Sequence, residues 1–276
     1  MNILGIHSFL SEHASSVALI DNLAHRTNLT VINTAPELLA RGDLLLCLSS
    51  KGVALHFTGR GVPNPIVVDF IDGASAHRRL FGGGKSQLIA KAVGLKGSYR
   101  PSVLDVTAGL GQDGFVLGSL GCEVKMLERV PVIFELLKDG LLRAEKSAQS
   151  DLQAIMSRVS VSCQDSLTYL TSHEFTTAAI PDVIYVDPMF PEREKSALVK
   201  KNMAVFQALV DGDIDAGELL ALALTKAKYR VVIKRPRKAL SIAEQFPEKK
   251  LPRASLVLEG KSSRYDIYAF AKMPDS

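Results

Sequence analysis

Residues 187–191 form an Asp-Pro-Met-Phe-Pro turn whose side chains suit group transfer to an exocyclic aromatic amine. The lone pair of such an amine is delocalised into the ring, so the nitrogen is a poor nucleophile. Asp187, together with a backbone carbonyl of the turn, could accept hydrogen bonds from the amine and aim its lone pair at an electrophile. Pro188 would fix the backbone, and Phe190 would stack on the base. The structural alternative is a turn that ends a strand and places a phenylalanine in the core.

A glycine-rich loop at residues 105–114, Asp-Val-Thr-Ala-Gly-Leu-Gly-Gln-Asp-Gly, leads from an apolar strand into a helix. Glycines are needed where the backbone turns sharply and a ligand must approach without a Cβ in the way. Gly109, Gly111 and Gly114 match the dinucleotide fingerprint G-x-G-x-x-G, which keeps a nicotinamide-dependent oxidoreductase open. Asp105, four residues before the first glycine, favours S-adenosylmethionine, because methyltransferases carry an acidic residue there near the cofactor's amino-acid portion.

Acidic residues after two neighbouring strands complete the candidate cofactor site. Glu128 follows an expected strand at 122–127, where a solvent-reachable carboxylate can accept both hydroxyls of a ribose. Either cofactor would use that contact, and the alternative is a surface glutamate that merely ends a strand. Asp165 and Ser166 follow an expected strand at 159–163, where methyltransferases contact the adenine amine. Both residue types also cap helices well, and the two roles can coexist.

The elements that must position these residues alternate between strand and helix, which predicts a mostly parallel sheet. The last two strands are separated by too short a segment for a parallel crossover, so they should be antiparallel. A mostly parallel sheet with an antiparallel C-terminal hairpin is the outline of the α/β, Rossmann-like class I methyltransferase fold. The expected strands are 102–106, 122–127, 159–163, 182–186, 229–234, 254–259 and 265–271, and the expected helices are 87–93, 113–120, 131–146, 165–171, 194–209 and 214–228.

Upstream of this pattern, short strands are expected at 44–48, 52–58 and 66–70, separated by turn signals. They predict a small β-rich N-terminal subdomain at residues 1–72, followed by the Rossmann-like methyltransferase domain at residues 73–276.

Composition indicates an ordinary globular protein, with 47% hydrophobic and 22% charged residues in 276. The first twenty residues lack a signal-peptide pattern, and no apolar run approaches the roughly 20 residues of a membrane helix, so we expect a cytoplasmic protein. Cys47, Cys122 and Cys163 match neither a disulfide framework nor a zinc knuckle. Six histidines show no metal-ligand spacing, and we assign no metal.

Positive charge is concentrated near the C-terminus, where residues 190–276 carry 17 basic and 11 acidic side chains. Such asymmetry is compatible with a polyanionic partner, although solvated lysine faces are commonplace. A Gly-Lys-Ser triplet at 84–86 invites a phosphate-loop interpretation, but Arg79 stands where that motif requires glycine. The basic residues that could grip an RNA backbone beside a flipped base are Arg78, Arg79, Lys85, Lys195, Lys200, Lys201, Lys234 and Arg235.

Several stretches resemble one family, and they occur in its expected order from about residue 66 to the end. They are HRRLFGGGK (77–85), TAGLGQDGFVL (107–117), MLER (126–129), DPMFP (187–191), KSALVKKNM (195–203), VVIKRP (231–236) and RYDIYA (264–269). They look like the ribosomal RNA small-subunit methyltransferase J family, which methylates the exocyclic 2-amino group of a guanine in 16S ribosomal RNA. Met189 departs from the proline usual in amine-methylating enzymes but fits this family's own turn.

The resemblance implies S-adenosylmethionine as cofactor and 16S ribosomal RNA or the small ribosomal subunit as partner. A dehydrogenase, or an RNA-binding module without catalysis, would instead leave the turn or the glycine loop without a task. The cofactor contacts implied by the resemblance or chosen from the loop are Gly109, Gly111, Gln112, Asp113, Glu128, Arg129, Asp165, Ser166 and Asp187.

Overall fold

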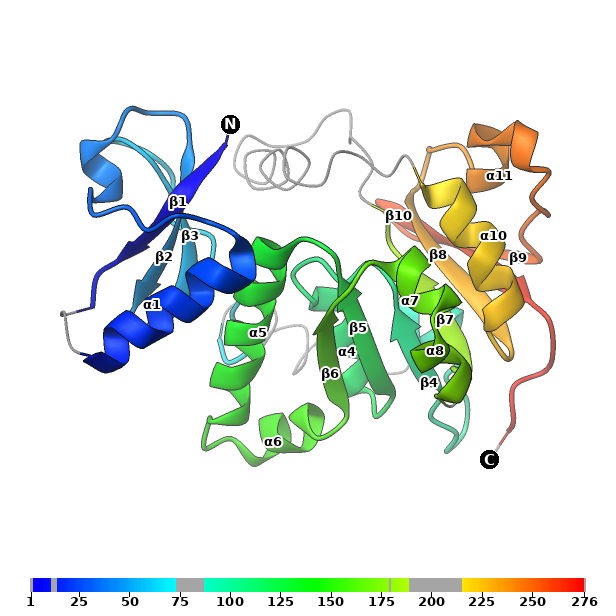
Figure 1. The fold of residues 1–276 in the computed structure, drawn as a ribbon. Helices are drawn as coiled ribbons and strands as arrows, with labels where there is room; N and C mark the ends of the chain where they lie inside the picture. Colours follow the sequence, from blue (N-terminus) through cyan, green and yellow to red (C-terminus); the bar gives the residue numbers. More distant parts are fainter. Residues whose placement is uncertain (1, 11–13, 73–86, 179, 189–214, 276) are drawn as a thin grey trace.

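The larger part of the protein is a seven-stranded sheet with helices on both faces (Figure 1). The computed structural model describes residues 2–10, 14–72, 87–178, 180–188 and 215–275. The strand order is β6-β5-β4-β7-β8-β10-β9, with β10 antiparallel to both β8 and β9 and the remaining pairs parallel. The strands are β4 (Ser102–Asp105), β5 (Glu123–Glu128), β6 (Val159–Cys163), β7 (Val183–Val186), β8 (Arg230–Pro236), β9 (Leu256–Glu259) and β10 (Ser263–Ala269).

Two hydrophobic cores lie on opposite faces of this sheet, because side chains alternate along each strand. In β7, Val183 and Tyr185 belong to one core, whereas Ile184 and Val186 belong to the other. Helices α3 (Leu88–Ala92), α4 (Gln112–Ser119), α5 (Pro131–Glu145) and α6 (Ser150–Met156) contribute to the first core. Helices α7 (Ser166–Thr171), α8 (His173–Thr177), α10 (Ala216–Lys226) and α11 (Ile242–Gln245) contribute to the second.

Local sequence accounts for where several helices begin. Pro131 opens α5 at its first position, where a missing N–H costs nothing. Asp165 caps α7 by accepting a hydrogen bond from the Thr168 N–H, and Ser241 and Glu244 form a reciprocal capping box on α11. The expected strands and helices of this domain are thus confirmed wherever the structure describes them, whereas α6, α8 and α11 were missed. The expected helix at 194–209 lies outside the described residues.

A second, three-stranded sheet is formed by the N-terminal residues, in the order β1-β2-β3. Strands β2 (Leu44–Ser49) and β3 (Gly52–Phe57) were expected, but β1 (Ile3–Ser8) and helix α1 (Ala14–Thr27) were not. The expected strand at 66–70 is wrong, since Ile66 makes only an isolated bridge to Leu55. The short 3-10 helices are η1 (Pro36–Leu38) in this region and η3 (Pro247–Lys249) near the C-terminus.

Helix α5 lies between the two sheets (Figure 1) and joins their hydrophobic cores. Arg26 of α1 binds Glu135 of α5 through both carboxylate oxygens, at 2.6 and 3.0 Å. Gly140 of α5 lies against Val68, where an added Cβ would come within 2.6 Å of a methyl group. The division into a subdomain at 1–72 and a domain at 73–276 stays a proposal. Within the described ranges, no helix is long and apolar enough to cross a membrane.

Candidate active site

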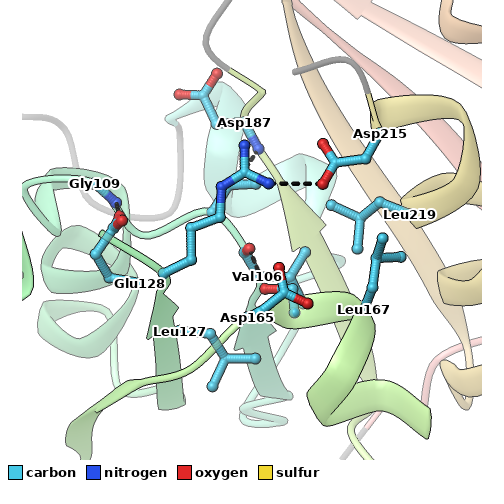
Figure 2. Close-up of a pocket in the computed structure, with 12 residues that line it drawn as sticks. Val106, Gly109, Leu127, Glu128, Asp165, Leu167, Asp187, Asp215 and Leu219 are labelled. Atoms are coloured by element: carbon cyan, nitrogen blue, oxygen red, sulfur yellow. Dashed lines mark hydrogen bonds and ion pairs between the residues drawn. The ribbon is translucent and has the colours of Figure 1, made fainter. Parts of the chain in front are cut away.

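A pocket lies at the carboxyl ends of the parallel strands, the edge where ligands bind in open α/β sheets (Figure 2). Its apolar wall comes from both sides of that edge: Val106, Leu127, Leu167 and Leu219. Its polar groups include most of the side chains chosen from the sequence: Glu128, Arg129, Asp165, Ser166, Asp187 and Asp215.

The glycine-rich loop between β4 and α4 supplies the backbone of this pocket. Gly109 and Gly111 have φ angles of 54° and 71°, a region that residues with a Cβ rarely adopt. An added Cβ at Gly111 would come within 2.4 Å of Leu137, and one at Gly114 within 2.4 Å of Met126, so these glycines permit close packing below the loop. Nothing lies within 4 Å of the corresponding point at Gly109, which lines the pocket.

Glu128 at the end of β5 holds the glycine loop in place. Its carboxylate accepts hydrogen bonds from the backbone N–H groups of Gly109 and Val130, both at 2.8 Å. Only 7% of the residue is exposed, so the expectation of a solvent-reachable strand tip is wrong. Burial raises the pKa of Glu128 above its ordinary value, although the two N–H groups act in the opposite direction. Each oxygen still has a second lone pair, so the carboxylate can also accept ribose hydroxyls.

Asp187 is fixed at the mouth of the pocket by two neighbouring strands. Its backbone N–H donates to the Thr107 hydroxyl at 2.6 Å, and its Oδ2 accepts from the Lys234 ammonium at 2.8 Å. Lys234 also donates to Asp113 Oδ2 at 2.6 Å, and the Tyr185 hydroxyl donates to the same oxygen at 2.7 Å. Burial alone would lower the pKa of Lys234, but the Asp187 and Asp113 carboxylates outweigh it and raise that pKa.

Asp165 and Ser166 combine a capping role with a place in the pocket wall. Asp165 accepts from both the backbone N–H and the hydroxyl of Thr168, each at 2.9 Å, which fixes the start of α7. The Ser166 hydroxyl donates to the Val106 carbonyl at 2.6 Å. Both side chains nevertheless line the pocket, so the structural role and the proposed adenine contact are compatible.

An ion pair between Arg129 and Asp215 runs along the pocket wall, with 2.6 Å between Nη1 and Oδ2 (Figure 2). It links the end of β5 to the residue before α10, and both side chains are about one-third exposed. Sequence reasoning identified Arg129 but missed Asp215, which lies more than 80 positions away. The only local signal was that an acidic residue stands where a helix was expected to begin.

Comparisons with known proteins agree on one family. A family model described as "Putative SAM-dependent methyltransferase" matches residues 24–270. A "Ribosomal RNA small subunit methyltransferase J" from Cellvibrio japonicus is 49% identical over 257 residues, which are 92% of this chain and 93% of that protein. The chain belongs to this methyltransferase family. A relative of the same name from Dechloromonas aromatica is 50% identical over 82% of this chain and 87% of its own length.

A solved structure supports the fold of this methyltransferase over nearly its full length. It is a SAM-dependent methyltransferase from Neisseria gonorrhoeae with a TM-score of 0.70 and 31% identity, covering 98% of this chain and 96% of its own. The class I, Rossmann-like fold is therefore confirmed, as is S-adenosylmethionine in place of a nicotinamide cofactor.

The pocket suits this cofactor by its chemistry. Glu128 offers carboxylate oxygens beside the open approach at Gly109, and Leu127, Leu167 and Leu219 offer apolar surface for a flat base. Gln112 and Asp113 do not line the pocket, and the Asp113 carboxylate is directed to Lys234 and Tyr185 instead. Their assignment as direct cofactor contacts therefore stays a proposal, with Asp113 acting in this structure on the lysine beside Asp187.

Two of the basic residues assigned to RNA require correction. Arg235 is only 1% exposed and donates to the Leu240 carbonyl, so we withdraw it as a phosphate contact. Lys234 is held between two carboxylates, which reassigns it from RNA to the site itself. Pro188 is buried directly after Asp187. The other assigned residues lie outside the described part of the chain: Phe190, Arg78, Arg79, Lys85, Lys195, Lys200 and Lys201.

Asp105 lies beneath the site with 2% exposure, and burial raises its pKa to about 8. The unfolded chain releases this proton near its ordinary pKa of 3.8, whereas the folded chain keeps it to about pH 8. Between these values the folded state binds more protons, so its stability falls as pH rises, by at most about 1.4 kcal/mol per pH unit.

We therefore expect Asp105→Asn to gain stability relative to the parent as pH rises from 5 to 8. The amide oxygen can still accept from the Thr107 N–H, which donates to Asp105 Oδ1 at 3.0 Å. Urea unfolding of both proteins at each pH measures the difference. A difference that stays constant from pH 5 to 8 would show that Asp105 does not hold its proton on folding.

Proposed function

We propose that the enzyme transfers a methyl group from S-adenosylmethionine to the exocyclic 2-amino group of a guanine in 16S ribosomal RNA. The observation that carries this proposal is the position of Asp187, an acceptor anchored at the mouth of the pocket directly before Pro188. The relatives named "Ribosomal RNA small subunit methyltransferase J" support the RNA substrate. The choice of guanine rests on the family resemblance of the sequence motifs.

In the proposed reaction, the amine nitrogen forms a bond to the methyl carbon as the carbon–sulfur bond breaks, and the bonding electron pair leaves with sulfur. When bound, S-adenosylmethionine supplies a methyl group activated as a sulfonium. Asp187 accepts a hydrogen bond from the amine and aims its lone pair along the line of displacement. The nitrogen then loses a proton, so no strong base is needed before transfer. Phe190 is assigned to stacking on the base.

The substrate is either free 16S ribosomal RNA or the assembled small subunit, and we place the reaction in the cytoplasm. The test uses both substrates from a strain that lacks this protein, with a labelled methyl group on the cofactor. Transfer to either substrate, and none to the same RNA from the parent strain, supports the proposal. Binding of RNA without transfer in any preparation would instead support a non-catalytic RNA-binding module.

Replacing Lys195, Lys200 and Lys201 by glutamine is expected to raise the Michaelis constant for RNA, by roughly tenfold, because phosphate contacts are lost. The salt dependence should flatten, by somewhat less than one unit of log–log slope per contact. Cofactor affinity should not change. The measurement is the Michaelis constant across a salt series.

The matched control replaces Lys96, Lys228 and Lys272, which lie near the amino ends of β4 and β8 and after β10, at the opposite edge of the sheet. This variant removes the same charge but should leave the Michaelis constant and salt slope near the parent values. An equal effect from both triple variants would assign the first three lysines to general attraction rather than to a defined contact.

A further inference from the structure

Lys234 occupies a buried junction between the two carboxylates nearest the catalytic turn. Its ammonium lies 2.6 Å from Asp113 Oδ2 and 2.8 Å from Asp187 Oδ2, and about a quarter of its side chain is exposed. The register of β7 and β8 explains this position. Val186 pairs with Ile233, so Asp187 and Lys234 come one position later, side by side at the carboxyl edge.

The lysine is itself anchored on the α4 face of the sheet. Alternation along the strands puts Tyr185 and Asp187 on the same face as Val232 and Lys234. Asp113, in the first turn of α4, accepts from both the fully buried Tyr185 hydroxyl and the Lys234 ammonium. A helix and two adjacent strands therefore determine where the ammonium lies.

The contact restrains a torsion that would otherwise be loose. The last torsion of an aspartate side chain is broad, because it joins an sp³ to an sp² carbon. The hydrogen bond from Asp187 N–H to Thr107 fixes the backbone but not that torsion, whereas the Lys234 contact acts on the carboxylate itself. Charge-assisted hydrogen bonds of this kind are short and directional.

We propose that Lys234 is a positioning residue, which fixes the orientation of the Asp187 carboxylate toward the target amine and is itself held by Asp113 and Tyr185. This inference rests on the proposed function of Asp187. It gives Lys234 a task in the methyl-transfer step rather than in binding RNA or cofactor. A lysine that served only to balance buried charge would have the same contacts, so the test must separate the two roles.

The test compares Lys234→Met with Lys234→Arg and with a matched control, Lys125→Met. Lys125 also holds a tyrosine hydroxyl and a carboxylate, those of Tyr169 and Glu174, but it lies on the opposite face of the sheet and outside the pocket wall. Single-turnover transfer is measured at saturating cofactor and RNA, and cofactor affinity is measured separately. We expect Lys234→Met to lower the rate about tenfold to a hundredfold with cofactor affinity within about threefold of the parent. Lys234→Arg should be intermediate, and Lys125→Met should match the parent.

A charge-balanced double variant, Asp113→Asn with Lys234→Met, keeps the test decisive if the single variant folds poorly. It removes the buried carboxylate that would otherwise lose its partner. If Lys234 positions Asp187, the double variant folds but remains about tenfold or more slower than the parent. Recovery of the parent rate, or a single Lys234→Met variant within about twofold of the parent, would overturn the inference. Absence of transfer by the parent enzyme would instead overturn the proposed function and, with it, the role of Lys234.

Discussion

Replacing Asp187 by alanine is expected to slow single-turnover methyl transfer by roughly a hundredfold or more, even at saturating S-adenosylmethionine. The methyl donor is already activated, so the enzyme's remaining task is to aim a delocalised lone pair, and orientation effects of that size are common. The structure strengthens this expectation, because Asp187 is anchored through its backbone to Thr107 and through its carboxylate to Lys234. Rapid-quench measurement of one turnover gives the rate directly.

Cofactor binding must be measured on the same variant, because Asp187 also lines the cofactor pocket. Phe190→Ala serves as the comparison, since loss of stacking should chiefly raise the Michaelis constant for RNA. An Asp187→Ala enzyme that binds both ligands and transfers methyl at nearly the parent rate would contradict the mechanism. A variant that fails only because cofactor no longer binds would make Asp187 a binding residue and pass the orienting role to the backbone carbonyls of the turn.

Glu128→Ala is expected to weaken S-adenosylmethionine binding about tenfold to a hundredfold, equivalent to roughly 1.5–3 kcal/mol for lost charge-assisted hydrogen bonds. The structure adds a second expected effect. Glu128 accepts from the Gly109 and Val130 N–H groups, so alanine leaves these donors without their acceptor and should also lower the melting temperature. Titration calorimetry gives the affinity, and thermal unfolding without cofactor gives the stability.

Glu123→Ala is the matched control, because Glu123 is an exposed glutamate at the opposite end of the same strand. It should change neither affinity nor melting temperature. Unchanged cofactor affinity in Glu128→Ala would remove Glu128 from the site. A loss of affinity no larger than the loss of folded protein explains would make Glu128 a support of the loop and not a cofactor contact.

The main sheet could be predicted because its strands are apolar runs followed by recognisable helix starts, such as Pro131 and Asp165. The glycine loop could be predicted because its backbone requires glycine at positive φ. The N-terminal strand β1 and helix α1 gave weaker local signals. Their hydrophobic faces are defined by contacts with β2 and α5, which are distant in sequence.

The network around Lys234 could not be predicted, because it depends on which strands are neighbours. Asp113, Asp187 and Lys234 meet only because α4 packs on the sheet where β7 and β8 are adjacent. The error at Arg235 had a local cause. The expected strand ended at 234, whereas β8 continues to Pro236, so Arg235 still alternates into the second face of the sheet and is buried. The burial of Glu128 likewise follows from its contact with Gly109.

Identifying the methylated nucleoside tests the central claim most directly. Ribosomal RNA or small subunits from a strain lacking the protein are incubated with purified enzyme and labelled S-adenosylmethionine, and the RNA is digested to nucleosides. Mass spectrometry is expected to find the label in guanosine methylated on its 2-amino group, at one position of 16S ribosomal RNA, with Asp187→Ala giving almost none. Label on the 6-amino group of adenosine, or a product formed equally by the Asp187→Ala enzyme, would contradict the account.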